Sequence, residues 1–235
     1  MGRAWVLLGM LLSTSTIAAL ELTGEGTIST EWIDRGISQT AGRPAFQFGL
    51  ELAADSGVYL GAWGSNVDFG GCCDERLQFD WTLGVARPWR EMTWDAGLTW
   101  SSFPGTSQDL DFAEYHLGLG WRRHGVQASW TPDFANLGRE LWYVELNGEF
   151  ELPWHALRLL LHAGYTHGSA LHQRFADETG LQPYRDWQLE LARDFGQFTV
   201  MLGWADTDLR GEFRVRDRAE HNDGRLFLAV ATTFP

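Results

Sequence analysis

Residues 77–85 (LQFDWTLGV) place large apolar side chains at Leu77, Phe79, Trp81, Leu83 and Val85, with smaller or polar residues between them. Successive side chains of an extended strand point to opposite faces, so this stretch predicts a strand with one apolar and one polar face. The same alternation recurs in residues 46–52, 92–100, 113–121, 142–150, 157–165, 198–204 and 226–234. Weaker segments near residues 26–36, 57–68, 125–132 and 184–194 bring the total to about twelve strands.

The length of these segments and the aromatic content favour strands that cross a membrane. Most segments are about nine to thirteen residues long, whereas strands of soluble proteins usually have about five or six. A tilted strand needs roughly nine to eleven residues to cross a bilayer. The chain also carries 13 Trp, 14 Phe and 5 Tyr, which suits the interfacial belts of a membrane protein.

Short and long connections alternate along the chain. Candidate tight turns lie at residues 55–57, 87–90, 123–125, 152–154 and 194–196, and the longer connections at 37–43, 69–75, 103–110, 133–139, 167–183 and 206–223. This alternation is typical of a barrel with short periplasmic turns and longer external loops. An open sheet in lipid would leave backbone N–H and C=O groups unpaired at its edges. The sequence therefore predicts an all-β fold, a closed antiparallel transmembrane β-barrel of about twelve strands.

The first nineteen residues are predicted to be a signal peptide. Arg3 precedes a compact apolar run, Trp5–Leu12 (WVLLGMLL), and small residues follow up to Ala18 and Ala19, where cleavage is expected. The apolar run is too short to span a bilayer. Residues 20–235 show no linker or abrupt change in composition, so we interpret them as one barrel domain. The expected location after export is the bacterial outer membrane.

Charge and cysteine content narrow the partners. The formal net charge of −13 argues against nucleic acid. Cys72 and Cys73 are adjacent, so they cannot link distant parts of the fold; a strained vicinal disulfide is one interpretation, and a loop feature without chemistry is the one we favour. Only Asp74 and Glu75 nearby could contribute to a metal site. No metal and no cofactor are expected.

Several segments resemble one known family. They are Arg35–Thr40 (RGISQT), Tyr59–Phe69 (YLGAWGSNVDF), Phe103–Gly105, Glu151–Pro153 and His162–Tyr165. Together they resemble the TorF family of porins, proteobacterial outer-membrane proteins, from about residue 24 to the C-terminus. The resemblance implies an outer-membrane barrel that conducts small solutes and supplies no catalytic or binding residues. Such barrels commonly end in an aromatic residue read by the barrel-assembly machinery, whereas here Phe234 is followed by Pro235.

The polar faces of the strands are expected to line the lumen. The predicted pore-lining residues are Asp80, Asp95, Glu114, Glu145, Glu149, Arg158 and Glu190. Fixed carboxylates in a narrow channel raise the local concentration of cations. We therefore expect weak cation selectivity that fades as salt screens the charges. The alternative is an interior filled by side chains whose charges pair across the lumen.

The tryptophans predict two belts at the two membrane interfaces. The outer belt is expected to contain Trp32, Trp63, Trp81, Trp100 and Trp142. The inner belt, near the short turns, is expected to contain Trp89, Trp94, Trp121, Trp130 and Trp154. Outer-membrane lipid is therefore an expected partner, together with the barrel-assembly machinery during biogenesis.

Three functions remain open, in a stated order of preference. The first is passive diffusion of small hydrophilic solutes. The second is a non-conducting structural or interaction barrel whose loops 167–183 and 206–223 bind something outside. The third is a lipid-modifying enzyme based on His167 and Ser169, which would share a face of an extended strand, with Asp177 or Glu178 as a third member. No recognisable motif surrounds Ser169, so the sequence favours a protein that is not an enzyme.

Overall fold

The protein is described by a computed structural model that covers residues 20–69, 74–154, 156–172, 183–209 and 224–235. The short strands β14 (Arg214–Val215) and β15 (Arg218–Ala219) are also described. The predicted signal peptide, residues 1–19, lies outside the described residues. So do Cys72, Cys73, Asp177 and Glu178.

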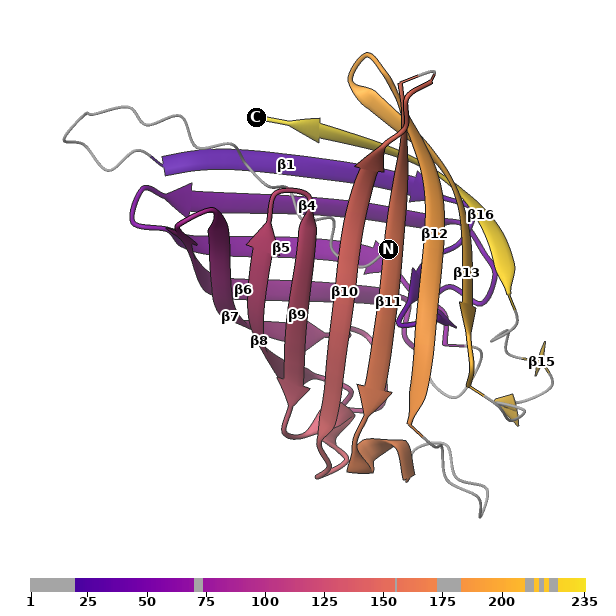
Figure 1. Cartoon of the computed structure of the whole chain (residues 1–235). Helices are drawn as coiled ribbons and strands as arrows, with labels where there is room; N and C mark the ends of the chain where they lie inside the picture. Colours follow the sequence, from indigo (N-terminus) through magenta and orange to yellow (C-terminus); the bar gives the residue numbers. More distant parts are fainter. Residues whose placement is uncertain are drawn as a thin grey trace.

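Twelve antiparallel strands close into one barrel (Figure 1). They are β1 (Leu20–Ser29), β4 (Ala45–Ala54), β5 (Val58–Asn66), β6 (Leu77–Trp89), β7 (Met92–Ser102), β8 (Phe112–Trp121), β9 (His124–Thr131), β10 (Leu141–Glu151), β11 (Leu157–His167), β12 (Tyr184–Phe195), β13 (Phe198–Thr207) and β16 (Arg225–Phe234). Each pairs with the next barrel strand along the chain, and β1 pairs with β16 to close the sheet. The predicted closed, twelve-stranded, antiparallel barrel is confirmed.

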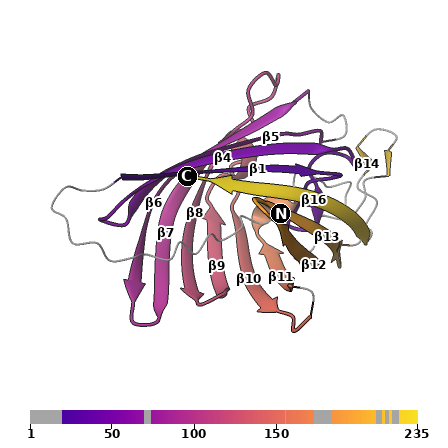
Figure 2. The ribbon, with the colours of Figure 1, turned by 90° about the horizontal axis from the view of Figure 1, so that it is seen from above.

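The two ends of the barrel differ in the length of their connections. At the short-turn end, strands are joined at residues 55–57, 90–91, 122–123, 152–156 and 196–197. At the long-loop end, the connections are residues 30–44, 67–76, 103–111, 132–140, 168–183 and 208–224. Figure 2 shows three of the short turns, those that follow β6, β8 and β10, along one edge. The predicted alternation is therefore present.

The strands tilt strongly against the barrel axis. In Figure 1 the wall formed by β1, β4 and β5 crosses the wall formed by β10, β11 and β12 at a steep angle. Such tilt accompanies the closure of a sheet into a barrel. The final strand ends at Phe234, whose ring stacks on Phe48 of β4 at 6.0 Å. Among the described residues, no helix is long and apolar enough to cross a membrane.

The alternation in the sequence sorts side chains between the inside and the outside of the barrel. On β10, Tyr143 and Glu145 are buried inside, whereas Val144 and Leu146 are exposed outside. The outward Leu117 of β8 is 62% exposed. Buried polar residues and exposed large apolar residues reverse the arrangement of a water-soluble protein. The apolar exterior is that expected of a barrel surrounded by lipid.

Glycines on the inner wall lie under aromatic rings from neighbouring strands. A Cβ added at Gly84 would be 2.3 Å from the Tyr59 ring, and one at Gly203 would be 2.1 Å from the Phe227 ring. Gly164 and Tyr143 form a third such pair, with the Tyr143 hydroxyl 2.2 Å from the added Cβ. The missing side chain lets each ring lie flat against the wall. These glycines therefore fix where the inward aromatic side chains sit.

Candidate functional site

The first long loop folds into the barrel. Within residues 30–44 lies a small hairpin, β2 (Ile33–Asp34) paired with β3 (Ile37–Ser38), which we name the lumen hairpin. Its turn residues, Arg35 and Gly36, have φ values of 49° and 74°, as a two-residue type I′ turn requires. A Cβ on Gly36 would lie 2.8 Å from Asp186 Cβ and 2.9 Å from Thr207 Cβ. The hairpin tip therefore touches the inner wall at β12 and β13.

Arg35 anchors the lumen hairpin to two further strands. Its Nη2 donates to both carboxylate oxygens of Glu114 on β8, at 2.8 Å and 2.6 Å. Its guanidinium also lies 4.4 Å from the centre of the Tyr143 ring on β10. Arg35 and Glu114 are each only 18% exposed. A charge-assisted hydrogen bond in such a partly buried position is stronger than one at the surface, so it holds the tip in place.

The Tyr143 ring belongs to a polar cluster on β10, β11 and β12. The Tyr143 hydroxyl donates to Asp186 Oδ1 at 3.1 Å. His162 Nε2 lies 3.0 Å from the same oxygen and 2.8 Å from the Tyr143 hydroxyl. His162 Nδ1 lies 2.8 Å from Asn147 Oδ1 and 3.6 Å from Glu145 Oε2. The side chains that support the hairpin are therefore themselves held by an inward hydrogen-bond network.

A second cluster lies on β5, β7 and β8. His116 Nε2 is 2.7 Å from Asp95 Oδ1, and the Tyr59 hydroxyl donates to the same oxygen at 3.2 Å. Both Asp95 and His116 are buried. Asp95 thus faces inward, as predicted, but its carboxylate is held against the wall by neighbouring strands.

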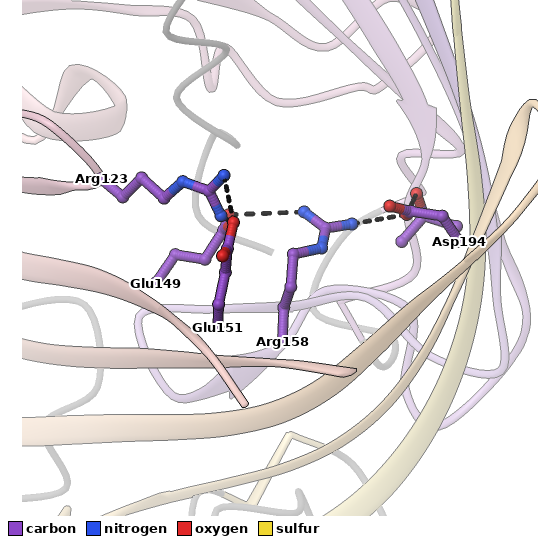
Figure 3. Close-up of polar contacts among 6 residues, drawn as sticks. Arg123, Glu149, Glu151, Arg158 and Asp194 are labelled. Atoms are coloured by element: carbon purple, nitrogen blue, oxygen red, sulfur yellow. Dashed lines mark hydrogen bonds and ion pairs between the residues drawn. The ribbon is translucent and has the colours of Figure 1, made fainter. Parts of the chain in front are cut away.

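An ion-pair chain follows the inner wall at the short-turn end (Figure 3). Arg123 Nη1 and Nη2 lie 2.6 Å from Glu149 Oε1 and from Glu151 Oε1. Arg158 bridges Glu149 Oε2 at 3.4 Å and Asp194 Oδ1 at 2.6 Å. Cations and carboxylates therefore alternate from the β8–β9 turn across β10 and β11 to β12. The predicted pore-lining residues Glu149 and Arg158 are partners in this chain.

A cavity of about 320 Å³ lies between the lumen hairpin and the surrounding strands. Carboxylates from the hairpin and from β1, β6, β8, β10 and β12 line it, namely Asp34, Glu25, Asp80, Glu114, Glu145 and Asp186. Among the described residues that line it, Arg35 is the one guanidinium. Toward the long-loop end the lining becomes aromatic, with Trp63, Phe103 and Phe112.

The predicted pore-lining residues all lie on inward faces. Asp80, Glu114 and Glu145 line the cavity, while Asp95 and Glu190 are buried in the wall. The alternation missed three residues that are central to the site: Arg35, Asp186 and Thr207. Asp186 carries a sequence signal, because it is in phase with the inward Gln188 and Glu190. Arg35 and Gly36 carry another, since a glycine beside a polar residue between two apolar ones is typical of a tight hairpin.

Two tryptophans predicted for the outer belt are inside the barrel mouth. Trp32 is only 6% exposed, and its ring centre lies 4.9 Å from that of Trp63. Both pack in an apolar cluster with Val67 and Phe103. The prediction was wrong because the first loop folds inward and brings Trp32 with it. Trp63 is in phase with the inward Tyr59 on β5, not with the outward Leu60.

Trp130 was assigned to the wrong belt. β9 starts directly after a short turn, so Trp130, near the other end of that strand, lies toward the long loops. Its ring stacks between those of Tyr115 and Trp142, at 5.7 Å from each. The remaining tryptophans lie on the outward face at the predicted ends. Toward the long loops these are Trp81, Trp100 and Trp142, and toward the short turns Trp89, Trp94, Trp121 and Trp154.

The arrangement required for the hydrolase hypothesis is absent from the described residues. β11 ends at His167, whose exposed ring stacks on that of Tyr165. Ser169 begins a short 3₁₀ helix, η2 (Ser169–His172), so the two residues do not share an extended strand. Within the described part of the chain, no group of three or more His, Cys, Asp or Glu residues is arranged to hold a metal ion.

Asp74 links two long loops and predicts an acid-sensitive mouth. Its Oδ1 accepts hydrogen bonds from the Ser107 backbone N–H at 2.8 Å and the Thr106 hydroxyl at 3.0 Å. These bonds hold the pKa of Asp74 below its ordinary value of 3.8. Because the folded-state pKa is lowered, the link is complete above pH 4 or so and is lost as pH falls through the lowered pKa.

The expected result is faster hydrogen exchange in residues 103–111 at low pH than at neutral pH. Asp74→Asn removes the carboxylate, so this variant should exchange faster at neutral pH and show a weaker dependence on pH. Asp109→Asn, a nearby carboxylate for which this link plays no part, is the control. Equal pH dependence of Asp74→Asn and the unmodified protein would rule the link out.

Comparison with known proteins places the barrel among membrane proteins. A family model described as a bacterial protein of unknown function (Gcw_chp) matches residues 14–234. No curated protein matches the chain. Of the solved structures, the NanC porin is similar with 9% identity and a TM-score of 0.56, over 92% of this chain and 100% of NanC. A chain from a study of in-meso crystallization of membrane proteins matches with 8% identity and a TM-score of 0.54, over 90% of this chain and 83% of that one. At these identities the likeness concerns the fold, which is a porin-like barrel.

Proposed function

The chain belongs to the Gcw_chp family of bacterial proteins of unknown function, and we propose that it is a porin-like outer-membrane channel for passive diffusion of small hydrophilic solutes. The observation that carries the proposal is a polar cavity inside an apolar-faced, closed barrel, with the lumen hairpin reaching into it. The resemblance to the TorF family of porins and the signal-peptide pattern of residues 1–19 support the same function and location.

The lumen hairpin is the proposed constriction. It crosses from the β1–β4 side to β8, β10, β12 and β13, where Arg35 and Gly36 make their contacts. A narrow section lined by charged groups selects solutes by size and by charge. The channel therefore admits small hydrophilic molecules and excludes larger ones.

Weak cation selectivity is part of the proposal. The carboxylates that line the cavity outnumber its one guanidinium among the described residues, even though Glu114 is neutralised by Arg35. Excess carboxylates in a confined, partly desolvated space concentrate cations. The pairing of other wall charges, such as Glu149 with Arg158, keeps the expected selectivity weak.

A non-conducting structural barrel is the alternative, and one observation favours it. The hairpin, the ion-pair chain and the two tyrosine–histidine–aspartate clusters occupy much of the interior. In this alternative the long loops would bind a partner outside the cell, and the interior network would only stiffen the wall. Conductance separates the two functions.

The test is a planar-bilayer recording of the refolded protein at two salt concentrations. We expect discrete conductance steps and, in a salt gradient, a reversal potential on the cation-selective side that shrinks at high salt. Asp80→Asn, which keeps the shape of a cavity-lining side chain, should shift the reversal potential toward zero. A protein that inserts without conducting would establish the structural alternative, and anion preference at low salt would refute the selectivity.

A further inference from the structure

Three arginines at the short-turn end lie over aromatic rings on the outside of the barrel. The guanidinium of Arg122 is 4.9 Å from the centre of the Trp121 ring, and that of Arg90 is 5.4 Å from the Trp89 ring. A third pair, Arg193 and Phe195, has a separation of 5.1 Å. All six side chains are exposed. The pairs come from the ends of β6, β8 and β12, so they occur at separate places around the same rim.

Two of these pairs share an unusual local structure. Trp89–Arg90 and Trp121–Arg122 each place an arginine directly after the last residue of a strand. Arg90 and Arg122 have φ values of 60° and 54°, a left-handed conformation that glycine or asparagine adopts at lower cost. A costly residue at the same position in two turns indicates that its side chain has a use beyond forming the turn.

The three arginines also differ from the inward ones in their partners. Arg35, Arg123 and Arg158 each pair with a carboxylate inside the barrel. Within the described part of the chain, no carboxylate oxygen lies within 4.0 Å of the guanidinium nitrogens of Arg90, Arg122 or Arg193. Their positive charge is therefore available to an anion from outside the chain.

Phosphate is the anion that this geometry fits. A guanidinium can stack on an aromatic ring with its face while its edge donates two parallel hydrogen bonds to a phosphate. The chain contains no lysine, so all of its basic side chains other than histidine have this bidentate form. The pairs lie at one end of the apolar exterior, which is where lipid headgroups meet the barrel if it spans a membrane.

We propose that the pairs Trp89–Arg90, Trp121–Arg122 and Arg193–Phe195 form a binding surface for the phosphate groups of phospholipids in the periplasmic leaflet. This inference rests on the proposed membrane location but not on conduction. Each ring packs against the upper acyl chains and glycerol of a lipid, while its arginine binds the phosphate. The surface fixes the depth of the barrel at its short-turn end.

The experiment measures phosphatidylglycerol bound to the full-length, detergent-refolded protein by native mass spectrometry across a lipid titration. The test variant combines Arg90→Asn, Arg122→Asn and Arg193→Gln, because asparagine tolerates the left-handed turn positions. The control combines Arg43→Gln, Arg76→Gln and Arg185→Gln, which removes the same charge at the long-loop end. We expect at least a fivefold loss of affinity in the test variant and little change in the control.

Further arms keep the result unambiguous. Oleate, an anionic lipid without phosphate, should bind the test variant and the unmodified protein alike. Equal phosphatidylglycerol affinity in the test and control variants, or an equal loss of oleate binding, would overturn the proposal. If the triple variant does not fold, Arg90→Asn and Arg122→Asn are titrated singly, with a twofold or smaller effect in both counting against the surface. Conductance of the same preparations is recorded in parallel, so failure of the channel function is seen separately.

Discussion

Replacing the lumen hairpin, residues 33–38, by a glycine–serine link of equal length is expected to raise the single-channel conductance several-fold. The hairpin crosses the interior and is held on its far side by Arg35, which binds Glu114 and lies over the Tyr143 ring. A link without Arg35 has no anchor on the opposite wall, so the constriction opens. Larger hydrophilic solutes should then pass in a liposome-swelling assay, which is the second readout.

The matched control is Arg43→Ala, in the same loop. Arg43 forms an ion pair with Asp68 near the rim at 2.7 Å and is half exposed, outside the constriction. Its removal should leave conductance unchanged. Arg35→Ala alone should give an intermediate increase, with more current noise, because it releases the tip but leaves the hairpin strands. A hairpin-free protein with the unmodified conductance would show that the hairpin does not form the constriction.

Gly164→Ala is expected to destabilise the barrel by about 2–4 kcal/mol, a large effect for one methyl group. The new Cβ would lie 2.2 Å from the Tyr143 hydroxyl and 2.4 Å from Asp186 Oδ2. Both groups belong to the network under the hairpin tip, so relief of the clash breaks hydrogen bonds in the interior. Urea unfolding in detergent, followed by tryptophan fluorescence, measures the change.

Gly26→Ala is the matched control for this change. Gly26 is also a barrel glycine, on β1, but the nearest atom to an added Cβ is the Thr232 Cγ2 at 3.8 Å, an ordinary contact. Its effect should stay within about 0.5 kcal/mol. Equal effects of the two substitutions would show that the close packing of Tyr143 on Gly164 does not constrain the barrel.

The sequence predicted the barrel because its strands obey a local rule. Residues 77–85 are sorted between lipid and lumen by parity alone, and the observed β6 contains the whole stretch with the predicted faces. The inward position of Asp80, Glu145 and Glu190 follows from the same rule. Alternation and the length of the connections suffice where one side chain in two must face lipid.

The site was only partly predictable because its contacts are not local. Arg35 and Glu114 are 79 residues apart, and no periodic pattern indicates that a loop folds back into the barrel. The same inward loop explains the error at Trp32. At Trp63 the failure has a different cause: a tryptophan fits either face of a strand near the barrel mouth, and its phase relative to Tyr59 is the better guide.

Tryptophan quenching by brominated phospholipids tests most directly whether the apolar face of the barrel meets lipid. The refolded protein is inserted into vesicles of dibrominated phosphatidylcholine, and its emission is compared with that in the unbrominated lipid. We predict strong quenching from outward rings such as Trp81 and Trp100, and its near-complete retention in a Trp32→Phe/Trp63→Phe variant. Emission that is unchanged by bromine, from a chain that remains monomeric in water without detergent, would contradict the account.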